Sequence, residues 1–544
     1  MAFAAPFVAV ALLVVLYQIY RRFTRTTISD LPGPEPESFI LGNLRQYFQS
    51  QAGDIDFEWQ EAYGDVVRFK GPFGEDRLLI SDPKALQYIF QTAGYRFGKQ
   101  AERREIAIML SGRGIVWSDG DDHKRHRRIM NPAFGGKETK AFVPLFSAYA
   151  AKLGNKWKDV LVASPKEGSV FNVSDWFSRA TLDAMGVAAF DYQFDLLENA
   201  NNELGIAYSK LLVGAFLYPS KAELLRQTLM PYLPKFLRSY IGTSAPNHRL
   251  QYLRNAAKVA TRVAKDLIYS KTEALSLGKG ARDVMSLLVN ANASEEPKTR
   301  MSEEEMIAQM RTLLLAGFET TATSLTWSVL ELARHTAVQD KLRKEIRAKQ
   351  REIKARGDSE FTSSDFEAMP YLTAFLKESL RFYPTVFNAF REAAVNDVLP
   401  LSKPITTRSG KVINEIPVPK GLKIIPSING YNRHKSLFGQ DSHIFDPERW
   451  LTPGRVEKPV NVGVYGNLLT FAGGIRSCIG WRFAVLELQT FLVELVADFE
   501  FSLTPEAQRV RRESCLVMTP MIEGQAEKGA QLPLLVKLAP QEED

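Results

Sequence analysis

The feature that most constrains the fold is a glycine-rich stretch at residues 471–480, FAGGIRSCIG, near the C-terminal end. It contains Cys478, one of only two cysteines in the 544-residue chain, and an apolar segment with helical spacing follows at 481–499. Glycine lets a backbone adopt positive φ and pass close to a large flat ligand. The stretch therefore predicts a tight loop that presents a sulfur atom and then enters a buried helix. Amide N–H groups at a helix N-terminus and a nearby guanidinium, here that of Arg476, favour a thiolate over a thiol.

A thiolate that is the single protein ligand suits haem iron. The stretch resembles the haem-ligand signature of the cytochrome P450 superfamily, Phe-x-x-Gly-x-Arg-x-Cys-x-Gly, and every fixed position is matched. The alternative is a buried free cysteine in a glycine-rich turn before a core helix. The resemblance implies that the cofactor is haem b, that Cys478 is its axial ligand, and that Phe471 and Arg476 contact it.

Composition excludes several other classes of protein. Two cysteines exclude a disulfide scaffold, a cysteine-ligated zinc cluster and an iron–sulfur cluster, and they fit a reducing compartment. Hydrophobic residues make up 45% and charged residues 24% of the chain, as in globular proteins. The net charge of +7 is modest, and no long basic tract accompanies it, so we expect no nucleic-acid partner.

The N-terminal segment predicts a membrane anchor. Residues 2–20 carry no charge, and their length is close to the ~20 residues needed to cross a hydrocarbon core. Three arginines follow by residue 25. A cleaved signal peptide is the alternative, but no charged segment precedes the apolar run and no clear cleavage site follows it. We expect a transmembrane anchor at 1–20, a basic and proline-rich hinge at 21–44, and a catalytic domain at 45–544. This arrangement predicts a single-pass protein of the endoplasmic reticulum membrane with a cytosolic catalytic domain.

A basic segment at 123–128, HKRHRR, has helical character. His123 and Arg127 are four residues apart, so they share a helical face that suits an anionic haem edge. The family commonly has Trp-x-x-x-Arg here, bound to a haem propionate, so the resemblance implies that His123 and Arg127 contact haem, with histidine in place of tryptophan. A solvated basic helix is the alternative, and Lys124, Arg125 and Arg128 fit it better, or else a docking patch for an acidic redox partner.

A long helix is predicted from the capping box at residues 302–305 to His335. It contains the segment AGFETT at 316–321, where a glycine costs about 1 kcal/mol relative to alanine. The alternative is close helix packing at a small residue, with Glu319 exposed. The segment resembles the family's acid–alcohol motif over the distal face of haem. This implies that Gly317 leaves room for a ligand, Thr320 steadies dioxygen, Glu319 supplies protons and Ala316 lines the substrate pocket.

Two further motifs extend the resemblance. Glu378 and Arg381 lie on one helix face, and Arg449 belongs to FDPERW at 445–450. Alone, the first pair would be a common surface pair. The family joins these three charges into a buried structural triad on the proximal side of haem, where removing one member costs about 3–5 kcal/mol.

The segment between these motifs lines the pocket in the family. Arg391 matches a position that usually meets a haem propionate. Val386, Phe387 and Phe390 are candidate pocket residues, although core packing explains each of them equally well.

Together these motifs predict a mainly α fold with small β-sheets, the cytochrome P450 fold, as one large catalytic domain. They imply a haem-thiolate monooxygenase that inserts one oxygen atom from O2 into an apolar small molecule, in fungal secondary metabolism such as terpenoid biosynthesis. NADPH–cytochrome P450 reductase is the expected electron donor, with cytochrome b5 as an optional second donor, because the chain has no nucleotide-binding loop of its own. The alternatives are a haem-thiolate isomerase or dehydratase, which the Glu319-Thr320 pair argues against, and a non-catalytic haem sensor.

Overall fold

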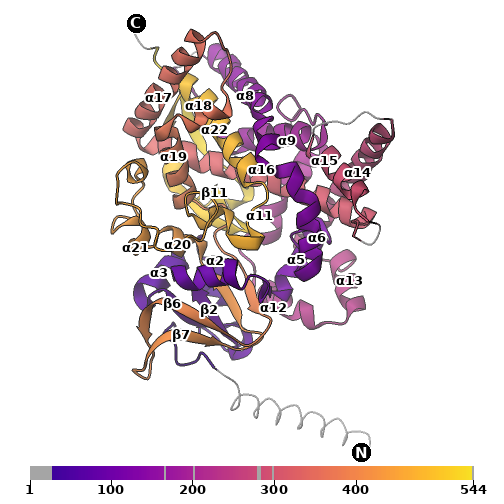
Figure 1. The fold of residues 1–544 in the computed structure, drawn as a ribbon, viewed down its shortest axis with the longest axis vertical. Coiled ribbons are helices and arrows are strands. Elements are labelled where there is room, and N and C mark those ends of the chain that lie inside the picture. Colours follow the sequence, from indigo (N-terminus) through magenta and orange to yellow (C-terminus); the bar gives the residue numbers. More distant parts are fainter. Residues whose placement is uncertain (1–26, 165–166, 200–201, 278–282, 297–298, 542–544) are drawn as a thin grey trace, which may run out of the picture.

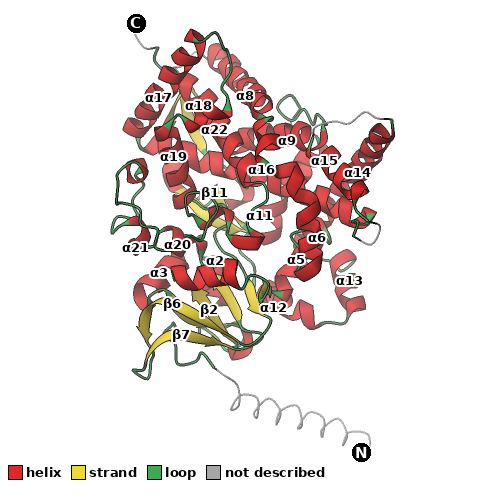
Figure 2. Ribbon diagram, in the orientation of Figure 1, coloured by secondary structure: helices red, strands yellow, loops and turns green. Residues whose placement is uncertain are grey.

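The computed structural model describes residues 27–541 except 165–166, 200–201, 278–282 and 297–298. The expected anchor at 1–20 and the first residues of the expected hinge lie outside this range. Among the helices that are described, none is both long and apolar enough to cross a membrane. A large helical body occupies one part of the molecule and the largest sheet occupies the other (Figure 1; Figure 2).

Seven long helices form most of the helical body: α8 (Val143–Ala163), α9 (Val173–Phe190), α14 (His248–Ser276), α16 (Glu303–Arg334), α17 (Thr336–Ala355), α19 (Pro370–Phe382) and α22 (Trp481–Asp498). Shorter helices complete it: α2 (Leu44–Gln49), α3 (Asp54–Tyr63), α4 (Pro83–Gln87), α5 (Ala101–Ser111), α6 (Gly120–Met130), α7 (Gly136–Lys140), α10 (Glu203–Ser209), α11 (Leu211–Phe216), α12 (Lys221–Leu229), α13 (Lys235–Thr243), α15 (Val284–Ser294), α18 (Ser363–Glu367), α20 (Ile428–Asn432) and α21 (Lys435–Phe438).

The described strands form four small sheets. The largest has the order β1 (Val66–Lys70), β2 (Asp76–Ile80), β8 (Lys423–Pro426), β5 (Arg391–Ala393) and β3 (Phe97–Lys99). The others are β6 (Asp397–Thr406) with β7 (Val412–Val418); β4 (Ser169–Asn172), β12 (Pro533–Leu538) and β9 (Phe499–Leu503); and β10 (Val510–Cys515) with β11 (Val517–Ile522). The expected mainly α fold with small sheets is therefore confirmed.

Helix α16 runs through the helical body, and its C-terminal half is buried on every side. Residues 321–333 are all buried, and the Trp327 indole stacks on Tyr383 with ring centroids 4.5 Å apart. The same indole donates from Nε1 to the Met518 carbonyl at 2.9 Å, which ties the helix to β11. At the other end, Ser302 and Glu305 form the predicted capping box. A helix fixed at both ends holds its middle turns, and therefore Glu319 and Thr320, in one place.

The described part of the expected hinge packs against β1. The Arg68 amide donates to the Pro32 carbonyl at 2.8 Å, and its guanidinium reaches the Leu31 carbonyl at 3.3 Å. A Cβ on Gly33 would lie 1.7 Å from the Arg68 carbonyl oxygen, so only glycine fits. This proline-rich segment is therefore fixed to the sheet.

Candidate active site

The cysteine loop ends where α22 begins. The Cys478 amide donates to the Phe471 carbonyl at 2.8 Å, which closes the loop. Burial raises the pKa of the Cys478 thiol, while the Gly480 amide and the Arg127 guanidinium act to lower it. Because burial dominates, the protein alone favours the thiol, and a coordinated metal cation would convert it to the thiolate.

The glycines of this loop are required by packing within the protein. A Cβ on Gly473 would lie 1.9 Å from the Val462 carbonyl oxygen, and one on Gly474 would lie 2.0 Å from that of Phe90. Gly474 also has a φ of +62°, which other residues rarely adopt. The expected positive φ is therefore confirmed at Gly474, and at 473 and 474 it is neighbouring protein backbone that excludes a Cβ. They let two neighbouring backbone segments hold the loop.

The thiol and two predicted pocket residues border an internal space. The Cys478 side chain is accessible to a molecule the size of water, although the surrounding protein desolvates the thiol strongly enough to raise its pKa. Ala316 is exposed in the middle of a helix that is otherwise largely buried, and Val386 is 42% exposed beside the buried Thr385. Because Cys478 is surrounded by protein and yet accessible, we infer an internal space beside it, and Ala316 and Val386 are the predicted pocket residues exposed enough to border it.

Cationic side chains gather beside this loop. Arg476 binds Asp119, and its Nη1 is buried without a hydrogen-bond partner in the described chain. Burial, with Arg476 nearby, lowers the pKa of Arg391 to about 10 and lowers that of Lys99 well below its usual range. Lys99 and Arg391 are paired directly across β3 and β5. Asp119 faces this cluster as a carboxylate, so the described cations exceed the anions, as a site for an anionic group requires.

His123 lies in the same place but is neutral. Burial, with Arg476 and Lys99 nearby, lowers its pKa to about 3. Its Nδ1 lies 3.0 Å from the Tyr95 hydroxyl, and a Tyr95 O–H donated to Nδ1 leaves the ring proton on Nε2. His123 can then donate one N–H, as an indole in this position would.

Arg127 contacts the cysteine loop directly. Its guanidinium donates to the Ser477 carbonyl, and its charge acts to lower the pKa of Cys478. Arg125, which the sequence assigned to a solvated surface, donates to Glu305 Oε1 at 2.6 Å, and His126 Nε2 lies 3.0 Å from the same oxygen. Glu305 therefore caps α16 and binds α6 with one carboxylate.

The acid and alcohol of α16 lie next to each other, each with its own environment. Burial raises the pKa of Glu319 to about 7, so the carboxyl exchanges its proton close to neutral pH. The Thr320 hydroxyl donates to the Ala316 carbonyl at 2.7 Å, so its lone pairs remain free to accept. The space beside Gly317 is filled by Met185 of α9, since a Cβ there would lie 1.9 Å from Met185 Cε. Gly317 therefore accommodates a protein side chain, which corrects the expectation that it leaves room for a ligand.

Glu487 of α22 is a buried carboxyl that sequence reasoning missed. It is 0% exposed, neither carboxylate oxygen has a hydrogen-bond partner in the described chain, and burial raises its pKa to about 8. It therefore carries a proton at neutral pH beside the acid–alcohol segment. A glutamate on the apolar face of a helix was the available signal. Tyr95, Lys99 and Asp119 were also missed, and isolated residues of these types give no such signal.

The three charges of the predicted triad lie together. Arg381 donates to both carboxylate oxygens of Glu378, at 2.8 and 2.7 Å, and Arg449 Nε reaches the same carboxylate at 3.5 Å. All three are at most 1% exposed. The Trp450 indole adds a fourth contact to Glu378, at 2.9 Å. Each guanidinium also binds backbone carbonyls, so the buried charges are fully surrounded by partners.

The predicted pocket residues divide into two groups. Ala316 and Val386 border the internal space described above. Phe387 packs against the main core, and Phe390 stacks on Phe48 with centroids 6.2 Å apart. The structure thus gives both phenylalanines packing partners.

Comparison with known proteins agrees with this geometry. The family model of Cytochrome P450 matches residues 32–523. The chain belongs to the cytochrome P450 family. It is 31% identical to Cytochrome P450 monooxygenase 128 of Postia placenta over 94% of this chain and 92% of that protein. It is 32% identical to Cytochrome P450 monooxygenase claU of Ampulloclitocybe clavipes over 96% of this chain and 94% of that protein.

As a cytochrome P450, the chain is a haem-thiolate monooxygenase, an oxidoreductase with a cysteine thiolate as axial ligand. The residues described fit that cofactor, because a lone accessible thiol, an internal space and a cluster of cations in excess over anions lie in one region. When bound, haem supplies the chemistry of dioxygen activation. Cys478 would hold the iron, and Arg391, Arg476, Lys99 and His123 would hold the propionates.

Proposed function

We propose that this P450 hydroxylates, or oxidises in a related way, an apolar small molecule of fungal secondary metabolism, such as a terpenoid. The observation that carries the proposal is the accessible Cys478 thiol beside an internal space that α16 borders with an acid–alcohol pair. Ala316 and Val386 give that space apolar walls. The named relatives come from two fungi, which supports a fungal role.

The protein's own groups have three tasks in this reaction. Apolar walls bind the substrate and exclude water. The Glu319 carboxyl, with a pKa near 7, holds and releases a proton at its carboxylate oxygens. The Thr320 hydroxyl can accept a hydrogen bond on the cavity side while its own O–H donates to the Ala316 carbonyl. A monooxygenase is favoured over an isomerase or dehydratase because the named relatives are monooxygenases.

The proposal extends to location and partners. The uncharged segment at 2–20 supports a single-pass anchor in the endoplasmic reticulum membrane with the catalytic domain in the cytosol. The exposed Lys124 and Arg128 of α6 support docking of an acidic flavoprotein, NADPH–cytochrome P450 reductase, with cytochrome b5 as a second donor. Fractionation of a fluorescent fusion, with a variant lacking residues 1–26 as control, tests the anchor.

Two experiments test the activity. A carbon monoxide difference spectrum of the reduced protein should show the thiolate-type Soret band, and Cys478→Ala should lack it. Thr320→Ala should then consume NADPH at a similar rate but form less product, while Thr326→Ala, a buried threonine further along α16, should not change this ratio. Unchanged coupling in Thr320→Ala would contradict the role of Thr320. Co-expression with candidate pathway enzymes, followed by product analysis, identifies the substrate.

A further inference from the structure

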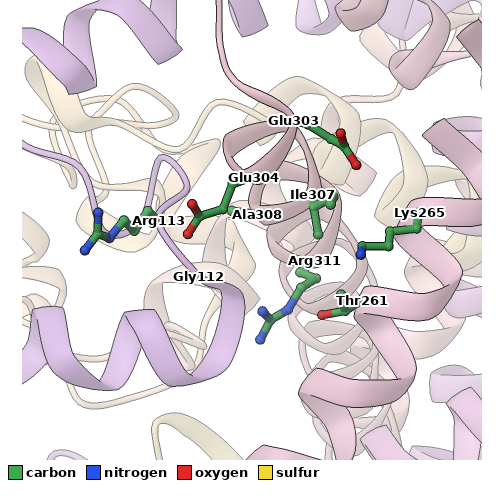
Figure 3. A pocket seen from close by; sticks show the side chains of 9 residues that line it. All are labelled: Gly112, Arg113, Thr261, Lys265, Glu303, Glu304, Ile307, Ala308 and Arg311. Carbon is green, nitrogen blue, oxygen red and sulfur yellow. The ribbon is translucent and has the colours of Figure 1, made fainter. Parts of the chain in front are cut away.

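A second cavity lies at the other side of α16, toward the protein surface. Its volume is about 430 Å³, and it is lined by residues of α14, α16 and the loop after α5: Gly112, Arg113, Thr261, Lys265, Glu303, Glu304, Ile307, Ala308 and Arg311 (Figure 3). None of these lining residues belongs to the haem site. Arg311 precedes Ala316 by five residues, so its side chain starts about 7.5 Å along the helix and points about 140° around it.

Arg311 is a cation held in a fixed position. Its Nη2 donates to the carbonyls of Leu110 at 2.7 Å and Met109 at 3.2 Å, in the last turn of α5. Its Nε is buried without a hydrogen-bond partner in the described chain. Among described residues no ion pair involves this guanidinium. A guanidinium anchored on one side loses little freedom when an anion binds to the other.

Two groups on α14 face Arg311. Thr261 and Lys265 are one helical turn apart, and Figure 3 shows the Lys265 ammonium and the Thr261 hydroxyl directed from α14 toward α16. Lys265 also has no ion pair in the described part of the chain. A hydroxyl, an ammonium and a guanidinium therefore surround one end of the cavity, which is a donor set that suits an oxyanion.

The charge balance selects a monoanion. Three cations, Arg113, Lys265 and Arg311, and two carboxylates, Glu303 and Glu304, leave the lining with a net charge of about +1. A carboxylate neutralises this charge. A phosphate dianion would leave the site with a net negative charge and be repelled by the two glutamates. Ile307 and Ala308 add apolar surface for a carbon chain.

We propose that this cavity binds a small organic acid, with its carboxylate at Arg311, Lys265 and Thr261 and its carbon chain against Ile307 and Ala308. The site lies outside the haem chamber, so its occupant is a ligand additional to the molecule that is oxidised at Cys478.

Isothermal titration calorimetry of the haem-loaded full chain with decanoate tests the site. We expect saturable binding that weakens as salt rises and that leaves the Soret spectrum unchanged. Decan-1-ol, which lacks the charge, and decyl phosphate, which carries a second charge, should both bind more weakly. Equal binding of the alcohol, or tighter binding of the phosphate, would overturn the assignment to a carboxylate.

Variants separate this site from the haem chamber. Arg311→Gln should weaken decanoate binding about 10- to 100-fold, as expected for a hydrogen bond to a charged group. Lys265→Gln, at an exposed position that does not endanger folding, should weaken it about two- to fivefold. Lys258→Gln, an exposed change two turns earlier on α14 and outside the lining, is the matched control and should have no effect. If decanoate shifts the Soret band and its affinity is unchanged in the Lys265 and Arg311 variants, the acid binds in the haem chamber and the proposal is refuted.

Discussion

Replacing Glu487 with glutamine should change how the stability of the protein depends on pH. The folded protein keeps a proton on this buried carboxyl until about pH 8, whereas an unfolded glutamate ionises from about pH 4.5. Between these values the unfolded state releases a proton that the folded state retains. Stability therefore falls as pH rises through this window, and the loss is complete above the folded pKa.

The magnitude follows from the two pKa values. A difference of about 3.5 units corresponds to about 5 kcal/mol over the full window, at 1.36 kcal/mol per unit. Between about pH 5.5 and 8.5 the wild-type protein should lose about 3 kcal/mol through this carboxyl. Glutamine has the same size and never ionises, so Glu487→Gln should lose none of it. Glu319 and Glu494 also have raised pKa values, but both proteins contain them, so their effect cancels in the difference.

Urea unfolding followed by circular dichroism across this pH range measures the effect. The free energy of unfolding of Glu487→Gln, relative to wild type, should rise by about 3 kcal/mol from low to high pH. Glu506→Gln, which changes an exposed carboxylate after β9, is the control and should show a flat difference. A flat difference for Glu487→Gln as well would refute the reasoning, because it would mean that the carboxyl ionises equally in both states.

Four further predictions test the site. Glu378→Gln leaves the buried Arg381 guanidinium without its carboxylate, while Arg449 keeps Asp441, and it should destabilise the fold by about 3–5 kcal/mol, measured by urea unfolding, with a loss of bound haem. Gly317→Ala should lower the free energy of unfolding by about 1–3 kcal/mol through overlap with Met185. Adding Met185→Ala should restore much of this loss, and a double variant no more stable than Gly317→Ala would contradict the contact. His123→Leu should release haem about 10- to 100-fold faster, whereas His123→Trp should retain it, as followed by transfer of haem to apomyoglobin. In the wild type, the fraction of NADPH use that yields product should fall as pH rises through about 7, because Glu319 then loses its proton. Glu319→Gln should show no such pH dependence. A pH dependence that persists in this variant would assign the titration to another group.

The sequence predicted the elements whose signals are local. The capping box fixes the start of α16 and is present as expected. The relation between Glu378, Arg381 and Arg449 could be expected only from the family, because about 70 residues separate the motifs and pairing over that distance depends on the whole fold. Trp450 was not expected to join them, since a tryptophan next to an arginine looks like ordinary core.

The parts that sequence could not supply depend on tertiary neighbours. The glycines at 317, 473 and 474 were each assigned to a ligand, but Met185, Val462 and Phe90 occupy the space beside them. A glycine in the sequence indicates that another group lies close to the backbone, but it does not identify that group. The pKa values near 7 and 8 in α16 and α22 likewise come from burial by other elements, which no local pattern contains.

Glu305 joins two helices that take part in different events. Its carboxylate caps α16, whose middle turns border the substrate space, and it also binds Arg125 and His126 of α6, which carries the expected reductase-facing cations. A substrate that shifts the start of α16 must therefore carry α6 with it or break a bond to a carboxylate whose pKa is lowered to about 2. The start of α16 and the middle of α6 are therefore coupled mechanically through one carboxylate.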